Sequence, residues 1–476
     1  MAFGGGLYTE QNKVLPGAYF NVSSQASTVT SYAVNGVVGL ITPMNWTDGR
    51  PVHFVCRELA PEFKDAYVWP DDAQSVIGIS AFAPIPDNFT GDSDLPKFLH
   101  AFLTDIFKNA TQCYIYPLTG NNKAKAKNDV ATAKNYGTRG NDLSVKIVSE
   151  DDKFKVVTLL GEETVDAQTV KASNELTDNA FVVFNKSKQL APTAATKLTG
   201  GVDGTVDVAE VALAVERLGD FGVNVVCPMV TLNNQSAITA VIEQCEKYGH
   251  WMQMFGAHTS GLVPDNGNEY LITPDVASAT VHLNLLYPWL AGASAACDLG
   301  RSLDNKRITS SLLTYLVNKE DMQPPTQKEL EHGMQSGYMM LHTVGGEWRV
   351  LNDNNSYIGY FQKASTSNSQ TKDKNFSYNQ VIRTLNSIFM DWSKIFENEF
   401  AGIAGTDESD RVNYKTRLVN NSNLYASKGA LKNFDSADIN VSQGQSSDSY
   451  FVEAFLQPNI CVRKVYHAIT VSKFAN

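Results

Sequence analysis

The period of the hydrophobic pattern changes part-way along the chain, and this change constrains the fold more than any other feature. Between about 135 and 190, short stretches alternate apolar and polar residues, separated by turn sequences such as Glu150-Asp151-Asp152. This pattern predicts a small antiparallel β module. From Val206 onward, helical and strand-like stretches alternate, which predicts an α/β layer with some parallel pairing. Because 476 residues exceed the usual size of one hydrophobic core, we expect several domains of mixed α/β and α+β type.

Apolar residues at helical spacing predict an amphipathic helix between Pro96 and Ala110. The alternation after Val206 is expected to continue with a strand at Val281–Leu285. A helix rich in small residues is expected around Ala291–Leu299, where close helix packing selects small side chains.

The C-terminal part carries clear helix signals. Ser377-Tyr378-Asn379-Gln380 has the form of a capping box and predicts a long helix to about Phe400, with Trp392 in its apolar stripe. Thr406-Asp407-Glu408 predicts the start of a second helix. Three β-like segments follow, at 437–441, 450–457 and 462–471.

Charge and composition disfavour several classes of protein. The formal net charge is −11 and the pI is about 5.3, which disfavours a protein that coats nucleic acid. The N-terminal sequence lacks the layout of a signal peptide, and no apolar run approaches the length of a membrane span, so we expect cytosolic synthesis. The cysteines lack metal-binding spacing and are interpreted as small buried hydrophobic residues. They are Cys56, Cys113, Cys227, Cys245, Cys297 and Cys461.

The motifs for enzyme chemistry are weak. No phosphate-binding GxxxxGK[ST] sequence occurs, and Gly200–Gly204 is interpreted as a turn. The segment Asp265–Glu269 is interpreted as a plain loop, and the eight histidines show no metal spacing, so we expect no cofactor and no metal. Ser294 lies among small residues and could be nominated as a nucleophile with His250, His258 and Asp220, but none of these lies in a distinctive motif. A soluble α/β hydrolase or nucleotide-using enzyme with an appended β module is the alternative reading of the chain.

Several stretches, in the right order, resemble the tail sheath proteins of contractile phages and of phage-like particles from Gram-positive bacteria. The resemblance spans nearly the whole chain and is weaker at about 320–375. The stretches that carry it are Tyr8-Thr9-Glu10-Gln11-Asn12-Lys13-Val14-Leu15-Pro16-Gly17-Ala18-Tyr19, Gly137-Thr138-Arg139-Gly140-Asn141-Asp142-Leu143, Leu198-Thr199-Gly200-Gly201-Val202-Asp203-Gly204 and Phe376-Ser377-Tyr378-Asn379-Gln380-Val381-Ile382-Arg383-Thr384-Leu385-Asn386-Ser387.

The resemblance implies a structural subunit without an active site. Such subunits stack as six-membered rings around a tail tube and contract to drive the tube through the target cell envelope. The implied partners are further copies of the chain, the tube protein, and baseplate and tail terminator proteins, with no nucleic acid and no membrane insertion. The implied location is the virion tail, assembled in the bacterial host cytoplasm.

The resemblance also implies six parts and two exchanged arms. The parts are an N-terminal arm (1–24), an N-terminal sheath domain (25–97), a β-rich, sandwich-like module (98–190), an α/β domain of subtilisin-like fold (191–345), a C-terminal sheath domain (346–461) and a C-terminal arm (462–476). The arms are expected to add strands to a small sheet in neighbouring C-terminal domains, with hinges at Gly4–Gly6, Pro16-Gly17 and Pro458-Asn459. The candidate arm strands are Ala18, Tyr19, Phe20, Asn21 and Val22, and Val465, Tyr466, His467, Ala468, Ile469, Thr470 and Val471.

Five basic residues gather in and after the second C-terminal helix of this acidic chain. The resemblance places a helix of this domain against the inner tube, which makes these residues candidates for tube contact; a solvated basic face is the alternative. They are Arg411, Lys415, Arg417, Lys428 and Lys432.

Overall fold

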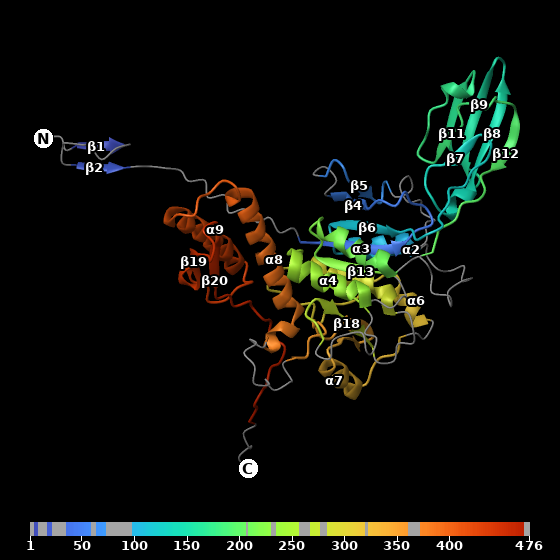
Figure 1. Cartoon of the computed structure of the whole chain (residues 1–476). Helices are drawn as coiled ribbons and strands as arrows, with labels where there is room; N and C mark the ends of the chain where they lie inside the picture. Colours follow the sequence, from blue (N-terminus) through green and yellow to red (C-terminus); the bar gives the residue numbers. More distant parts are fainter. Residues whose placement is uncertain are drawn as a thin grey trace, which may run out of the picture.

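A computed structural model shows three bodies and two terminal segments (Figure 1). It describes residues 4–7, 17–20, 35–58, 63–72, 98–205, 208–229, 235–256, 267–276, 283–318, 322–359 and 372–470. We call the bodies the central body, the β module and the C-terminal body. The β module projects from one side of the central body, and the C-terminal body lies on the other side (Figure 1).

A seven-stranded sheet forms the centre of the central body, in the order β15-β14-β13-β3-β6-β4-β5. Neighbouring strands are parallel from β15 to β6, whereas β4 runs antiparallel to β6. Strands from before and after the β module thus share one sheet. The strands are β3 (Val37–Pro43), β4 (Val52–Cys56), β5 (Tyr67–Trp69), β6 (Gln112–Leu118), β13 (Val225–Pro228), β14 (Gln253–Phe255) and β15 (Leu271–Ile272).

Both faces of this sheet are covered, which explains why its central strands read as continuous apolar runs. On one face Val37, Ile41 and Val226 pack with helices α3 (Val208–Gly219) and α4 (Gln235–Tyr248). On the other face Val38 and Leu40 pack with helices that include α2 and α5. The bounds of this second pair are Phe98–Phe107 for α2 and Tyr287–Ala295 for α5. The helix predicted at 96–110 is therefore confirmed.

A smaller sheet completes the central body, with strands in the order β16-β17-β18. Helix α7 contacts β17. The elements are β16 (Pro274–Asp275), β17 (Met339–Val344), β18 (Glu347–Val350), α6 (Leu313–Asn318) and α7 (Gln327–Gln335).

The β module is antiparallel, as predicted. Its main sheet has the order β10-β9-β8-β12, and β7 pairs with β11. One apolar cluster, with Val145, Val156 and Phe184 among its members, fills the module. The strands are β7 (Ala131–Ala133), β8 (Leu143–Glu150), β9 (Lys153–Leu160), β10 (Glu163–Val170), β11 (Val182–Phe184) and β12 (Thr193–Lys197).

Two long helices and a hairpin build the C-terminal body. They are α8 (Asn379–Ile395), which continues as one turn of π-helix (Phe396–Phe400), α9 (Glu408–Ser427), β19 (Ile439–Gln443) and β20 (Tyr450–Ala454). Trp392 packs against the apolar clusters on both sides of it, as expected of a core residue. The predicted start of α9 is confirmed, because the Asp407 side chain accepts a hydrogen bond from the Asp410 N–H.

Two local predictions are wrong. The strand expected at Val281–Leu285 is a 3₁₀ turn over Leu283–Leu286, which leads directly into α5 with Pro288 in the first turn of that helix. The capping box at Ser377 does not form, because α8 begins after Tyr378 and the Ser377 hydroxyl donates to the Lys374 carbonyl at 2.8 Å. The small-residue helix begins earlier than expected. Its close packing is confirmed, since a Cβ at Gly292 would lie 2.6 Å from the Ile106 carbonyl oxygen.

Candidate assembly surfaces

The hairpin β19–β20 packs one face on α9 and exposes the other. Ile439, Val441 and Val452 join the apolar cluster beneath the hairpin, whereas Phe451 and Phe455 are 55% and 73% exposed. In the described part of the chain no third strand joins the hairpin. Its two outer edges therefore present unpaired backbone N–H and C=O groups, which is the geometry that accepts an added strand.

The N-terminal arm forms a small parallel pair of its own. Strand β1 (Gly4–Leu7) pairs with β2 (Gly17–Phe20), and the pair lies apart from the three bodies (Figure 1). Ala18, Tyr19 and Phe20 therefore have the predicted strand conformation, whereas Asn21 and Val22 lie outside the described residues, as does Pro16. The glycines expected to form a hinge, Gly4–Gly6, lie within β1.

The C-terminal arm has no strand structure in the single chain. Residues 461–470 have no regular secondary structure, and Val471 lies outside the described residues. Apolar side chains are nevertheless strongly exposed along this segment: Val465 by 66%, Tyr466 by 88% and Ile469 by 83%. The hinge expected at Pro458-Asn459 stays a prediction. In this structure the Asn459 N–H donates to the Ala430 carbonyl at 2.8 Å and the Asn459 side chain donates to Gly429.

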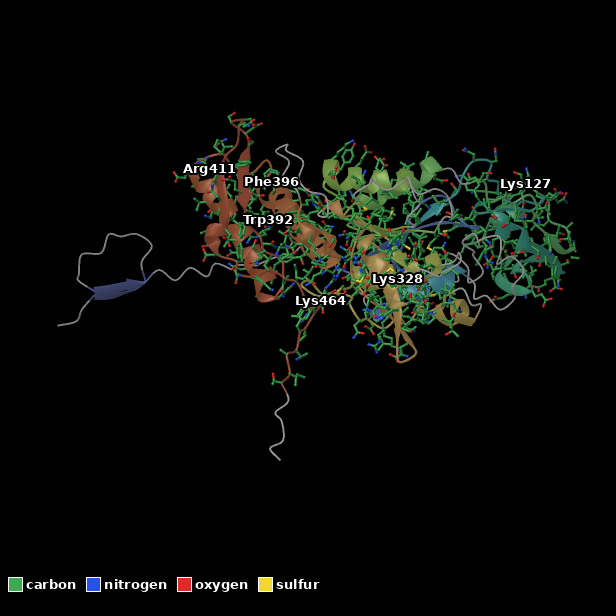
Figure 2. The ribbon with its side chains drawn as sticks, turned by 90° about the horizontal axis from the view of Figure 1, so that it is seen from below. Lys127, Lys328, Trp392, Phe396, Arg411 and Lys464 are labelled. Atoms are coloured by element: carbon green, nitrogen blue, oxygen red, sulfur yellow. The ribbon has the colours of Figure 1, made fainter. Side chains whose placement is uncertain are left out.

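The five basic residues are not equivalent. Arg417 forms a two-point ion pair with Glu399, at 2.6 Å from each nitrogen, and Arg411 donates to Gln443 and to the Thr406 carbonyl. Lys415, Lys428 and Lys432 have no ion-pair partner among the described residues. Figure 2 shows Arg411 and Phe396 toward the end of the C-terminal body that lies away from the central body.

A buried ion pair joins the central and C-terminal bodies. Arg383, on α8, donates to Asp353 at 2.5 Å, and the Asp353 side chain is fully buried. Burial raises the pKa of Asp353, but Arg383 and hydrogen bonds from the Leu303 N–H and Asn379 outweigh it and hold the pKa below its usual range. Sequence reasoning missed this pair, because Asp353 lies in the polar run Asn352–Ser356, which resembles a loop.

A second ion pair anchors the start of the C-terminal arm. The Arg463 Nε lies 2.6 Å from Asp304 Oδ2, and its guanidinium stacks 4.3 Å from the centre of the Tyr378 ring. Burial raises the pKa of Asp304, and the attraction of Arg463 offsets only part of this rise. Sequence reasoning placed Arg463 in the arm, with nothing in the sequence to indicate its partner.

The nominated catalytic residues do not form a triad in the described part of the chain. Ser294 is fully buried and accepts a hydrogen bond from Arg383 at 3.3 Å. His250 faces Asp220 at 3.6 Å, whereas the hydrogen-bond partner of the Ser294 hydroxyl is Arg383. His258 lies outside the described residues.

The glycine-rich turn and the buried cysteines have structural roles. The Gly200–Gly204 turn is confirmed: Gly201 donates to Asn141, and Asp203 accepts from Thr138, so the turn is tied to the start of the β module. Cys113, Cys227 and Cys245 are buried, and burial raises the pKa of Cys245 to about 12. The expectation of burial is only partly met for the other three cysteines, which are half-buried.

The described residues contain no cluster of three or more side chains that could hold a metal ion. Within them, no helix is both long enough and apolar enough to span a bilayer.

Known proteins with a similar sequence and a similar fold agree with the resemblance given in the sequence analysis. Residues 119–203 match a phage tail sheath protein beta-sandwich domain, and residues 371–472 match a phage tail sheath C-terminal domain. The chain is 23% identical over 517 residues to the phage-like element PBSX protein XkdK of Bacillus subtilis (strain 168), an alignment that covers 98% of this chain and 100% of the relative.

Two solved structures share the fold. A sheath tail protein from Desulfitobacterium hafniense superposes with a TM-score of 0.69 at 21% identity, over 93% of this chain and 96% of that one. A sheath tail protein from Listeria innocua gives a TM-score of 0.67 at 22% identity, over 89% and 92%.

Proposed function

This chain belongs to the phage tail sheath proteins, and we propose that its copies stack as six-membered rings around a tail tube and contract to drive that tube through a target cell envelope. In this proposal neighbouring copies are linked by their terminal arms, which add strands to the β19–β20 hairpin of adjacent subunits. Baseplate and terminator proteins lie at the two ends of the stack, and the assembled sheath is part of a virion tail or a related particle.

The observation that carries the proposal is that the hairpin has open edges while the C-terminal arm has no partner strand among the described residues. A two-stranded hairpin is at best marginally stable alone, and here both of its edges are open within the described residues. The C-terminal arm exposes Val465, Tyr466 and Ile469 without a partner strand. Adding an arm strand to a hairpin edge pairs backbone groups and covers exposed apolar side chains, so it stabilises both.

Contraction in this proposal needs no nucleotide. The extended sleeve is a metastable state, and small gains at each subunit interface sum over the polymer when it relaxes. An enzymatic role is not part of the proposal, since Ser294 is enclosed and bonded to Arg383. The net charge of −11 also disfavours a nucleic-acid partner.

We also propose that lysines in and just after α9 contact the tube. The residues best suited are Lys415, Lys428 and Lys432, whose ammonium groups are not used in ion pairs among the described residues. Arg417 and Arg411 hold the C-terminal body together through Glu399 and Gln443, so their contribution to tube binding is secondary.

Electron microscopy of the full chain tests the assembly proposal. The protein is expressed alone and together with a tube protein from the same particle, and each preparation is imaged over a wide range of salt and protein concentration. Hollow ribbed cylinders are expected, most readily where tube is present. Discrete compact monomers under every condition, including with tube, would overturn the proposal and favour the soluble-enzyme alternative.

A further inference from the structure

The C-terminal arm does not leave the subunit from the hairpin that precedes it. After β20 the chain follows Ala430–Lys432, with the Lys432 N–H donating to Gln457 and the Asn459 N–H donating to Ala430, both at 2.8 Å. It then crosses to the central body. Lys464 marks the point where the C-terminal arm leaves the subunit, at the boundary between the C-terminal and central bodies (Figure 2).

Arg463 is the last residue held at this crossing. Its Nη1 donates to Asn354 Oδ1 at 2.6 Å and its Nη2 donates to Asp304 Oδ1 at 3.1 Å, in addition to the ion pair with Asp304 and the stacking on Tyr378. Arg463 and Asp304 side chains are only 19% and 22% exposed. From Lys464 to Thr470 every residue is exposed.

Gln380 holds the chain just before Arg463. Its side-chain oxygen accepts from the Cys461 N–H at 3.2 Å, and its nitrogen donates to the carbonyls of Asn459 and Gly300, each at 2.8 Å. Gln380 is 1% exposed. The root of the C-terminal arm is thus bound to the loop that follows α5, at Gly300 and again at Asp304.

Gly36, the residue before β3, is bound to the other end of the same loop. The Gly36 N–H donates to the Ala295 carbonyl at 2.8 Å, and the Gly36 carbonyl accepts from the Thr111 and Gln112 N–H groups. The next residue, Val37, begins β3 and donates to Asn224 at 2.9 Å. Residues 295–304 therefore contact both the root of the C-terminal arm and the residue before β3 within one short stretch.

Arg383 holds this loop in place through hydrogen bonds. It donates to the Arg301 carbonyl and to Ser294, and it is itself fixed by the buried Asp353 carboxylate. Leu303 and Asp304 are tied to the same place, because the Leu303 N–H donates to Asp353 and Asp304 accepts from the Asp353 N–H at 2.7 Å. A load applied to residues 295–304 thus acts on a buried ionic cluster.

We propose that Arg463 is a positioning residue that clamps the C-terminal arm to Asp304, and that the braced loop 295–304 joins this clamp to Gly36, the residue before β3. Tension that reaches a subunit through its C-terminal arm then passes through this loop into the central sheet. The inference rests on the proposed arm-linked assembly and adds to it the path of the force within one subunit.

The first test uses the isolated subunit and does not depend on assembly. Hydrogen exchange is measured by mass spectrometry on peptides that cover 457–464, for the wild type, Arg463→Ala and Arg417→Ala. Arg417 is the matched control, because it also forms a two-point pair of similar exposure, with Glu399 in the C-terminal body. Exchange in 457–464 is expected to rise about tenfold in Arg463→Ala and to stay unchanged in Arg417→Ala, since a charged hydrogen-bond pair is lost at the arm root only in the first. Unchanged exchange in Arg463→Ala would overturn the clamp.

The second test uses assembled sleeves. Wild-type and Arg463→Ala sleeves are sheared or exposed to increasing urea, and sleeve length is measured by electron microscopy. Arg463→Ala sleeves are expected to break at lower shear and lower urea than wild-type sleeves. Sleeves of equal strength, from a variant whose arm root exchanges faster, would overturn the load path. If the wild type forms no sleeves at all, the assembly proposal fails, while the exchange result still decides the clamp.

Discussion

Asp353 shows how much of this structure depends on single polar residues in the interior. Its carboxylate is fully buried and receives hydrogen bonds from Arg383 on α8 and from the Leu303 N–H of the central body. A buried charge of this kind is tolerated only where its partner and further hydrogen bonds compensate for lost hydration. The pair therefore links the two bodies and makes each residue strongly dependent on the other.

Replacing Asp353 by Asn is expected to destabilise the subunit by about 3–5 kcal/mol, because it leaves the Arg383 charge buried without its counter-ion. Urea unfolding measures the change, and Asp298→Asn at an exposed position of the neighbouring loop is the control. The folded-state pKa of Asp353 lies below the ordinary value of 3.8, so its contribution is present above that pH and is lost as pH falls through the lowered pKa. The difference between wild type and variant should accordingly shrink below pH 3.8; a constant difference would contradict this account.

Local sequence rules failed where tertiary contacts used the same side chains. Ser377 and Gln380 have the spacing of a capping box, yet the Gln380 side chain bonds to Gly300, Asn459 and Cys461, far away in the sequence. Nothing local distinguishes these partners from the helix N-terminus. By contrast, the Asp407 cap was predictable because its partner, the Asp410 N–H, lies within the same turn.

Helix α9 shows the same division at the scale of elements. Its start could be predicted from Asp407, but its basic residues could not be sorted by sequence into engaged and available groups. Arg417 lies against Glu399, which belongs to the end of the preceding helical segment, and that contact depends on how the two helices pack. Lys415, Lys428 and Lys432 remain as the side chains able to meet another molecule.

Charge reversal of these three lysines tests the proposed contact with the tube. The triple variant Lys415→Glu, Lys428→Glu and Lys432→Glu is expected to fold normally and to lose most co-sedimentation with tube, because three attractions become repulsions. Arg417→Glu is a poor substitute, since it places two carboxylates together at Glu399 and disturbs the C-terminal body itself. The control is Lys146→Glu, Lys153→Glu and Lys197→Glu on the β module, where the same charge change is expected to leave binding intact. Equal binding by the α9 variant and the wild type would refute the contact.

At the scale of the whole molecule, the antiparallel β module and the α/β layer could be predicted as kinds of structure, but the way distant strands share a sheet could not. The period-two pattern at 143–170 gave three real strands, and the helices at 208–248 appeared near their predicted places. Strand β13, however, pairs with β3 at a separation of nearly two hundred residues, with the entire β module inserted between them. Periodicity identifies an element and its buried face but carries no information about which distant strand lies beside it.

The arms belong to this largest scale, because their partners are expected on other copies. Residues 464–476, extended at roughly 3.3 Å each, reach about 40 Å from Arg463, which is enough to cross onto a neighbouring body. Two deletions test the linkage: removal of residues 1–16, and truncation after Lys464, which takes away the arm while keeping the Arg463 clamp. Both variants are expected to unfold at the wild-type temperature, since β1 lies apart from the three bodies (Figure 1) and residues 465–470 are exposed. Both are expected to form no cylinders.

Truncation after Val462 distinguishes loss of the clamp from loss of the arm alone. It removes Arg463 as well, so it should also fail to assemble and, unlike truncation after Lys464, should show faster hydrogen exchange at 457–461 because Asp304 and Tyr378 lose their partner. Calorimetry and circular dichroism establish that each shortened subunit is folded before assembly is scored by electron microscopy on added tube. Normal cylinders from either arm deletion would mean that the contacts between folded bodies suffice, and that the exposed Val465, Tyr466 and Ile469 are covered in some other way.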